Sequence, residues 1–154
     1  GIYRSIAIIG DIVGTKEKAD ALVDSLKKRV AAVESASEQG AGYRVFVQIS
    51  DEPLYAAGGG SFITDLIERA GGFSTTAAIK EAYPKLSKET ALAMQPDVII
   101  LSGMAGEQKM NAVFANSPAA KNKKVFQIDG DLLTRPGPRS VDALEQIAEK
   151  LKAD

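Results

Sequence analysis

The most conspicuous candidate for binding chemistry is a run of three glycines, Gly58–Gly60, directly before a predicted helix over residues 61–70. Backbone amides at a helix N-terminus can hold an anion, so a nucleotide-binding loop is one interpretation. The run lacks the G-K-[ST] ending of a Walker loop and the G-x-G-x-x-G spacing of a dinucleotide loop. The alternative is that the glycines allow another backbone segment to approach closely. Gly59, together with Tyr55 in the loop ahead of it, is a candidate for ligand contact.

A second segment combines an aromatic ring with a carboxylate at a helix start. Pro84 restricts Tyr83 to an extended conformation, so the ring of Tyr83 is expected to project from a loop. Ser87 is a favourable N-cap, and it places Glu89 in the first helical turn, where the helix dipole stabilises a carboxylate. This contact with the dipole is by itself one explanation of Glu89, and a role in docking is the other.

A third segment, residues 129–139, carries Arg135 and Arg139 among proline and glycine residues. A guanidinium group donates hydrogen bonds as a rigid fork that suits planar anionic groups, whereas pairing with a neighbouring carboxylate is the alternative role. Asp129 and Asp131 lack the other ligands of a calcium loop, so we interpret them as turn residues.

The composition excludes several kinds of chemistry. The 154 residues contain no cysteine and no histidine, which excludes thiol nucleophiles, Ser-His-Asp triads and Cys or His metal sites. Nineteen Lys and Arg against 20 Asp and Glu give a net charge of -1, so the charge does not indicate nucleic acid. No apolar run approaches the roughly 20 residues of a membrane-spanning helix. We therefore expect one globular domain that binds a ligand, with no catalytic residue, metal site or cofactor.

The elements that must position these loops alternate along the chain. Strands are predicted over residues 43–49, 97–102 and 124–128, and helices over residues 2–13, 16–34, 61–70, 88–94, 106–116 and from 138 onward. This alternation predicts an α/β fold, a Rossmann-like three-layer α/β/α arrangement with a mostly parallel sheet. Ligands of such sheets collect beyond the carboxyl ends of the strands. That rule selects residues 51–61, 102–106 and 129–139 as the binding face.

Taken in order, these motifs resemble the C-terminal lobe of class III periplasmic substrate-binding proteins. The matching pieces are Tyr55–Ile63, Ala70–Gly72, Tyr83–Glu89, Gln95–Ile100 and Arg135–Arg139. This family comprises the iron-siderophore, haem and cobalamin receptors of ABC importers, in which one rigid helix joins two α/β lobes with the ligand between them. The resemblance implies that residues 1–14 are the end of that connecting helix and residues 15–154 the C-terminal lobe. The N-terminal lobe of the same protein is then expected upstream.

The resemblance also implies roles for single residues. The position of Tyr83 resembles the aromatic site that packs against the bound ligand, and Tyr55, Gly59 and Arg135 are further candidates in the cleft. Glu89 resembles the exposed glutamate that docks onto an arginine of the membrane permease.

The implied protein is extracytoplasmic, either periplasmic or membrane-anchored, and it delivers a ferric siderophore, haem or a corrinoid to an ABC permease. Arg135 would suit an anionic siderophore or haem propionates, which favours an iron complex, whereas a corrinoid would need few charges beside Tyr83. Two other functions stay open. One is a small Rossmann-like enzyme that binds a nucleotide or flavin at Gly58–Gly60, and the other is a sensor lobe that has kept the fold without transport.

Overall fold

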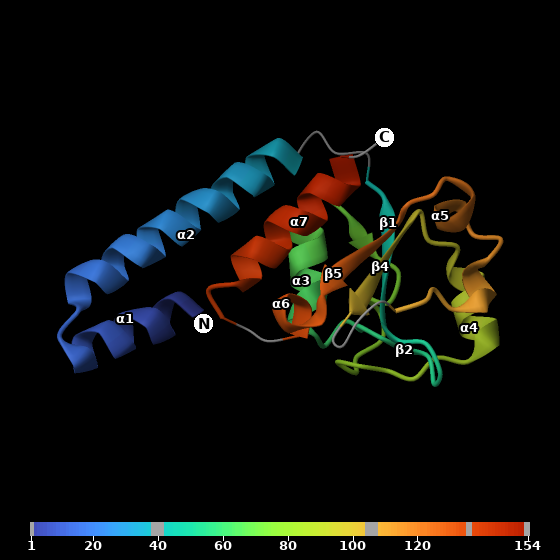
Figure 1. Cartoon of the computed structure of the whole chain (residues 1–154), viewed down its shortest axis with the longest axis horizontal. Coiled ribbons are helices and arrows are strands. Elements are labelled where there is room, and N and C mark those ends of the chain that lie inside the picture. The colour runs from blue at the N-terminus through green and yellow to red at the C-terminus, as the bar shows by residue number, and fades with distance from the viewer. Residues whose placement is uncertain (1, 38–41, 104–107, 135–136, 153–154) are drawn as a thin grey trace.

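A computed structural model describes residues 2–37, 42–103, 108–134 and 137–152. The helices are α1 (Ile2–Val13), α2 (Lys16–Ser37), α3 (Phe62–Arg69), α4 (Lys88–Met94), α5 (Pro118–Lys121), α6 (Gly130–Thr134) and α7 (Ser140–Lys152), with a 3-10 turn, η1 (Ala112–Phe114). The strands are β1 (Arg44–Ser50), β2 (Tyr55–Ala56), β3 (Phe73–Ser74), β4 (Val98–Gly103) and β5 (Val125–Asp129). Helices cover both faces of the sheet, and α1 and α2 lie outside these layers (Figure 1).

The sheet has the order β2-β1-β4-β5. The long pairs are parallel: β1 with β4 in the register Val45↔Val98, and β4 with β5 in the register Ile99↔Val125. The short strand β2 is antiparallel to the end of β1, while β3 is parallel to its beginning. The predicted mostly parallel α/β fold is therefore confirmed.

Two apolar cores lie on opposite faces of the sheet, because successive strand residues point to opposite sides. Val47 and Ile100 pack under α3 and α7 against residues such as Leu144. Phe46 and Ile99 pack on the other face, where the rings of Phe46 and Phe114 have centroids 4.5 Å apart. The central strands are buried on both faces, as their almost continuous apolar sequence predicts.

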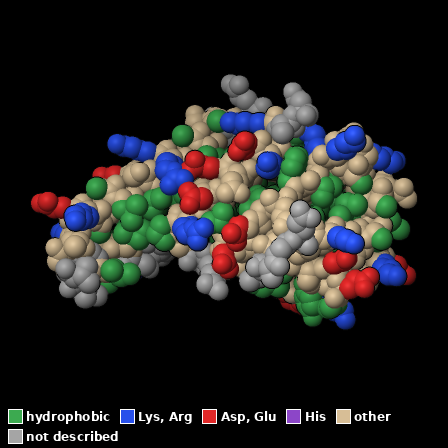
Figure 2. Space-filling model, viewed as in Figure 1, with side chains coloured by type: hydrophobic (Ala, Val, Ile, Leu, Met, Phe, Trp, Pro, Cys, Tyr) green, Lys and Arg blue, Asp and Glu red, His purple; other side chains and the backbone are tan. Residues whose placement is uncertain are grey.

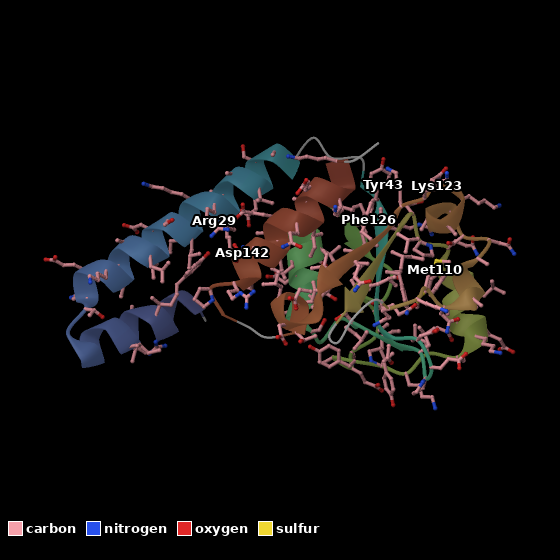
Figure 3. All side chains as sticks on the ribbon, viewed as in Figure 1. Arg29, Tyr43, Met110, Lys123, Phe126 and Asp142 are labelled. Carbon is pink, nitrogen blue, oxygen red and sulfur yellow. The ribbon has the colours of Figure 1, made fainter. Side chains whose placement is uncertain are left out.

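Helix α2 is joined to the lobe by ion pairs of two arginines and by Val30 and Val33, which pack against the core that contains Leu144. Figure 3 shows Arg29 of α2 and Asp142 of α7 pointing toward one another, and their ion pair measures 2.5 Å. Arg29 also pairs with Glu145, and the hydrogen bond with Asp142 is the main cause that raises the pKa of Arg29. Arg69 of α3 pairs with Glu34 of α2 at 2.9 Å. The 22 residues of α2 form the longest described helix, about 33 Å from end to end.

Helix α1 packs against α2 and ends at Val13, and Gly14 follows it with a φ of 73°, a left-handed conformation that glycine adopts without steric cost. Ile8 and Ile9 of α1 are 47% and 60% exposed, and Leu22 of α2 is 43% exposed. Figure 2 shows hydrophobic side chains gathered over this pair of helices. None of the described helices combines the length and the apolar character needed to cross a bilayer.

Two sequence predictions of local structure were wrong. Within the described part of the predicted helix 106–116, residues 108–111 are irregular and only η1 is helical. The side chain of Asn111 caps η1 by accepting a hydrogen bond from the Val113 amide at 2.9 Å, which favours a new start there. The segment 129–139, predicted as a loop, contains α6, because Asp129 Oδ1 accepts a hydrogen bond from the Asp131 amide at 2.8 Å.

Candidate ligand-binding face

Two of the predicted segments pair with each other beside the end of β1. Residues 54–58 run antiparallel to residues 82–86, with Tyr55 opposite Lys85. The backbone hydrogen bonds are Leu86 N to Leu54 O at 2.9 Å, Ala56 N to Pro84 O at 3.0 Å and Gly58 N to Ala82 O at 2.8 Å. Every bond keeps the same register, so these segments act as one ribbon at the edge of the sheet.

This ribbon brings Tyr55 and Tyr83 to one side. Leu54, Ala56, Pro84 and Leu86 are buried, whereas the alternate residues Tyr55 and Tyr83 are 36% and 40% exposed. In the register of this ribbon Tyr83 is the diagonal neighbour of Tyr55, and diagonal residues of paired strands lie roughly 7–8 Å apart. Tyr55 also pairs with Ser50 at the carboxyl end of β1, the edge at which such sheets bind ligands. We name this pair the tyrosine strip.

The three glycines have a structural role in the ribbon. The amides of Gly58, Gly59 and Gly60 donate to the carbonyl oxygens of Ala82, Ile79 and Glu81, at 2.8, 2.7 and 3.4 Å. A Cβ at any of the three positions would collide with a backbone carbonyl oxygen of residues 77–81. The interpretation as a close backbone approach is therefore confirmed. The interpretation as a nucleotide loop with free amides is wrong, because these amides are already bonded. Gly59 therefore offers no free donor to a ligand.

Glu89 lies where the sequence predicts it, in the first turn of α4. The hydroxyl of Ser87 accepts a hydrogen bond from the Thr90 amide at 3.2 Å, so the predicted N-cap is confirmed. Glu89 is exposed beside this cap. Its carboxylate is thus held at the surface by a fixed helix start, which suits a contact with a cation.

The arginines of the third segment are not brought to the tyrosine strip. Arg135 lies outside the described residues. Arg139 is exposed just before α7, where it lines a groove of about 410 Å³ between α2 and α7 with Arg29, Asp142 and Glu145. The interpretation of Asp129 and Asp131 as turn residues was wrong for the same segment, because Asp129 is the last residue of β5 and Asp131 lies in the first turn of α6.

A network of side-chain amides at the carboxyl ends of the strands escaped the sequence analysis. Gln48 in β1, 0% exposed, donates to Gln108 Oε1 at 2.6 Å and to the Lys109 carbonyl at 2.7 Å. Gln48 Oε1 accepts from the Asn111 amide at 2.9 Å. Gln108 then donates to the carbonyls of Ile49 and Ser102 at 3.0 and 2.8 Å.

This network connects two walls of a groove. The side chain of Asn111 donates to Asp51 Oδ1 at 2.9 Å and to its carbonyl at 3.0 Å. Residues 51–54 form one wall and residues 109–113 the other, around a volume of about 710 Å³. Met110, labelled in Figure 3, lies on the second wall. The sequence signal for this network is Gln48 itself, a polar residue inside the apolar run 45–49, but nothing in the sequence identifies its partners.

The described residues contain no group of three or more His, Cys, Asp or Glu side chains arranged to hold a metal ion. The side chains that this face exposes include the aromatic rings of Tyr55 and Tyr83 and the carboxylate of Glu89. Such a surface can bind a large ligand.

Comparisons with known proteins identify the family of this chain. The family described as periplasmic binding protein matches residues 1–132. The chain belongs to this family.

Two curated relatives and a solved structure show which members of the periplasmic binding protein family it is similar to. An uncharacterized ABC transporter substrate-binding lipoprotein of Bacillus subtilis, YvrC, is 26% identical over 99% of the chain and 50% of its own length. A vitamin B12-binding protein of Vibrio cholerae is 33% identical over 71% of the chain and 40% of its own length. The chain spans about half the length of these relatives or less.

An ABC-type Fe3+-hydroxamate transport protein from Saccharomonospora viridis is the solved structure. It has 29% sequence identity and a TM-score of 0.85, covering 99% of the chain and 55% of its own. The resemblance to class III substrate-binding proteins is therefore confirmed.

Proposed function

We propose that this chain is one lobe of the substrate-binding protein of an ABC importer, and that it holds a large metal chelate against the tyrosine strip. The lobe binds and releases its ligand without catalysis. The observation that carries the proposal is the pairing of residues 54–58 with 82–86, which presents Tyr55 and Tyr83 together at the carboxyl end of β1. Aromatic rings offer large apolar faces with a polar tip, which suits a macrocycle.

A corrinoid is the leading ligand. The relative with 33% identity is a vitamin B12-binding protein, and the tyrosine strip offers aromatic faces. The preference of the sequence analysis for an iron complex rested on Arg135, which lies outside the described residues. Haem and ferric hydroxamates therefore stand as competing ligands, the latter supported by the likeness to the Saccharomonospora viridis protein.

The second wall of the cleft is proposed to come from another lobe of the same protein. Residues 1–14 were expected to be the end of the connecting helix, and residues 15–154 the C-terminal lobe. The structure turns at Gly14, so α1 and α2 together are the proposed connection, with α2 as its longest part. The exposed Ile8 and Ile9 of α1 support a further packing partner.

The proposed location is extracytoplasmic, either periplasmic or anchored at the membrane, with the ABC permease as partner. The likeness to a substrate-binding lipoprotein supports this placement. Glu89 is the proposed docking residue, because its carboxylate is exposed at the capped start of α4.

The ligand proposal is tested by titrating cyanocobalamin, haemin and ferrichrome into the full-length protein that carries this chain, using calorimetry. Cyanocobalamin is expected to bind most tightly, and Tyr83→Ala to weaken its binding roughly 10-fold or more, since a buried aromatic contact often dominates an interface. The matched control is Phe73→Ala, because Phe73 is an exposed aromatic residue in β3 at the opposite end of β1. Equal loss in both variants, or none in Tyr83→Ala, would contradict the role of the strip.

The docking proposal is tested by uptake of the preferred ligand in cells. Glu89→Ala is expected to lower uptake several-fold while the affinity for ligand stays within about twofold. The reason is that a charge at the rim of the interface with the permease governs encounter and register there, and has no contact with the ligand in this proposal. Glu68→Ala, an exposed carboxylate on α3, is the control. A large loss of ligand affinity in Glu89→Ala would rule out docking as its role.

A further inference from the structure

Gln48 is a fully buried polar residue in a strand that is otherwise apolar at its centre. Its neighbours Phe46 and Val47 are 0% and 1% exposed and belong to the two cores. Burial of a carboxamide is costly unless its polar atoms are hydrogen-bonded. The cost of burying the Gln48 carboxamide must therefore be offset by the hydrogen bonds that it makes.

The carboxamide of Gln48 is bonded to one distant segment. Both hydrogen bonds from Nε2 go to this segment, to Gln108 Oε1 at 2.6 Å and to the Lys109 carbonyl at 2.7 Å. Its Oε1 accepts from the Asn111 amide at 2.9 Å. A glutamine side chain can make four hydrogen bonds, and three of those of Gln48 join it to residues 108–111, about 60 positions away in sequence.

The segment held by Gln48 in turn holds the turn that leads to Tyr55. Asn111 bonds to Gln48 through its backbone amide, and to Asp51 through its side chain at 2.9 and 3.0 Å. Asp51 begins the turn 51–54 that enters β2. A continuous chain of hydrogen bonds therefore runs from Gln48 through Asn111 to Asp51, at the start of the turn that leads to Tyr55.

We propose that Gln48 is a positioning residue for ligand binding: its carboxamide fixes residues 108–111, and Asn111 passes that placement to the turn that carries Tyr55. The proposal rests on the proposed function, since the affected property is the affinity for the ligand. Buried and fully bonded polar networks specify one arrangement of the groups that they join. An apolar residue of the same length would fill the space and leave the segment without its three bonds.

The test measures ligand affinity in the full-length protein with cyanocobalamin, haemin and ferrichrome as probes. Gln48→Met and Asn111→Ala are each expected to weaken binding of the preferred probe about 10-fold, because each breaks the same chain of hydrogen bonds. The double variant is expected to bind the probe at most about twofold more weakly than either single variant, since the effects of substitutions within one hydrogen-bond network are not additive. A purely structural role would not produce this pattern in affinity.

Ser117→Ala is the matched control. The hydroxyl of Ser117, 2% exposed, donates to the Phe114 carbonyl at 2.7 Å and belongs to the cap of α5, outside this network. It loses a buried hydrogen bond and is expected to leave the ligand affinity within about twofold. If Gln48→Met fails to fold, Asn111→Ala carries the test alone, because it keeps the backbone bond to Gln48 while it cuts the link to Asp51 together with the side-chain cap of η1.

The outcomes separate the two proposals. Wild-type affinity in Gln48→Met or Asn111→Ala, or full additivity in the double variant, overturns the positioning role while the proposed function stands. A wild-type protein that binds none of the three probes overturns the proposed function, and the positioning role for these ligands falls with it. A non-additive loss, absent in Ser117→Ala, supports both.

Discussion

The two sides of the turn at the end of β1 are built in opposite ways. On one side, Gly58–Gly60 bond to residues 79–82 through backbone atoms alone, and the absence of side chains is what lets the backbones meet. On the other side, residues 108–111 are held by the side-chain amides of Gln48 and Gln108. The first junction, between Gly58–Gly60 and residues 79–82, depends on the absence of side chains. The second junction, between the strands and residues 108–111, depends on specific side-chain amides.

This difference affects how each junction responds to change. A backbone junction accommodates an added atom poorly, because a Cβ on any of the three glycines would lie within 2.1–2.3 Å of a carbonyl oxygen. A side-chain junction loses only the bonds of the residue that is replaced, and the neighbouring chain can relax. Mutations on the two sides are therefore expected to differ in magnitude, and an exposed ionic junction such as Arg29 with Asp142 is expected to be weaker than either.

The largest effect is expected at Gly59. Gly59→Ala places a Cβ against the carbonyl oxygens of Ala77 and Ile79, and should lower the free energy of unfolding by about 3 kcal/mol. Urea denaturation followed by far-ultraviolet circular dichroism measures the change. Gly137→Ala is the control, because no atom lies within 4 Å of its added Cβ, and it should change stability by less than about 0.5 kcal/mol. Equal stability of the two variants would contradict the close-approach account.

An intermediate effect is expected at Gln108. Gln108→Ala removes the donor to the carbonyls of Ile49 and Ser102 and the acceptor for Gln48, so it should cost about 1–2 kcal/mol. The same denaturation experiment applies, with Gln146→Ala on α7 as a glutamine outside the network. If Gln108→Ala proves as damaging as Gly59→Ala, the contrast between the two junctions is lost.

The smallest effect is expected at Arg29. Its ion pairs with Asp142 and Glu145 join side chains that are 40–43% exposed, so Arg29→Met should lower stability by less than about 1 kcal/mol. The difference from wild type should shrink further as salt is added, because exposed charges are screened. Lys28→Met, an exposed charge on the same helix, is the control. A loss above about 2 kcal/mol that is insensitive to salt would place this contact among the buried ones.

Several local features could be predicted because their causes are local. The N-cap at Ser87 and the exposed ring of Tyr83 follow from residue type and from the proline nearby. The central strands follow from apolar runs of strand length. Each of these signals lies within a few residues of the structure that it specifies.

The helix α6 was missed although its cap, the bond from the Asp131 amide to Asp129, is local, whereas the other misses have causes distant in sequence. The predicted helix 106–116 failed in its described part because Gln108 and Asn111 bond to β1, β4 and the 51–54 turn. These partners are between 6 and 63 residues away in sequence. The two-residue strands β2 and β3 also depend on pairing with distant segments, both with β1 and β2 with residues 84–86 as well. Such elements have no periodicity of their own to detect.

The sequence by itself determined the alternation of helices and strands, the absence of cysteine and histidine chemistry, and the motifs that resemble a substrate-binding lobe. Only the tertiary structure decided that the glycine amides are occupied, that Tyr55 and Tyr83 share one face, and that Gln48 holds residues 108–111. The physical reason is that periodicity and capping are properties of neighbours along the chain. The hydrogen-bond partners of a buried amide are chosen by packing between distant segments.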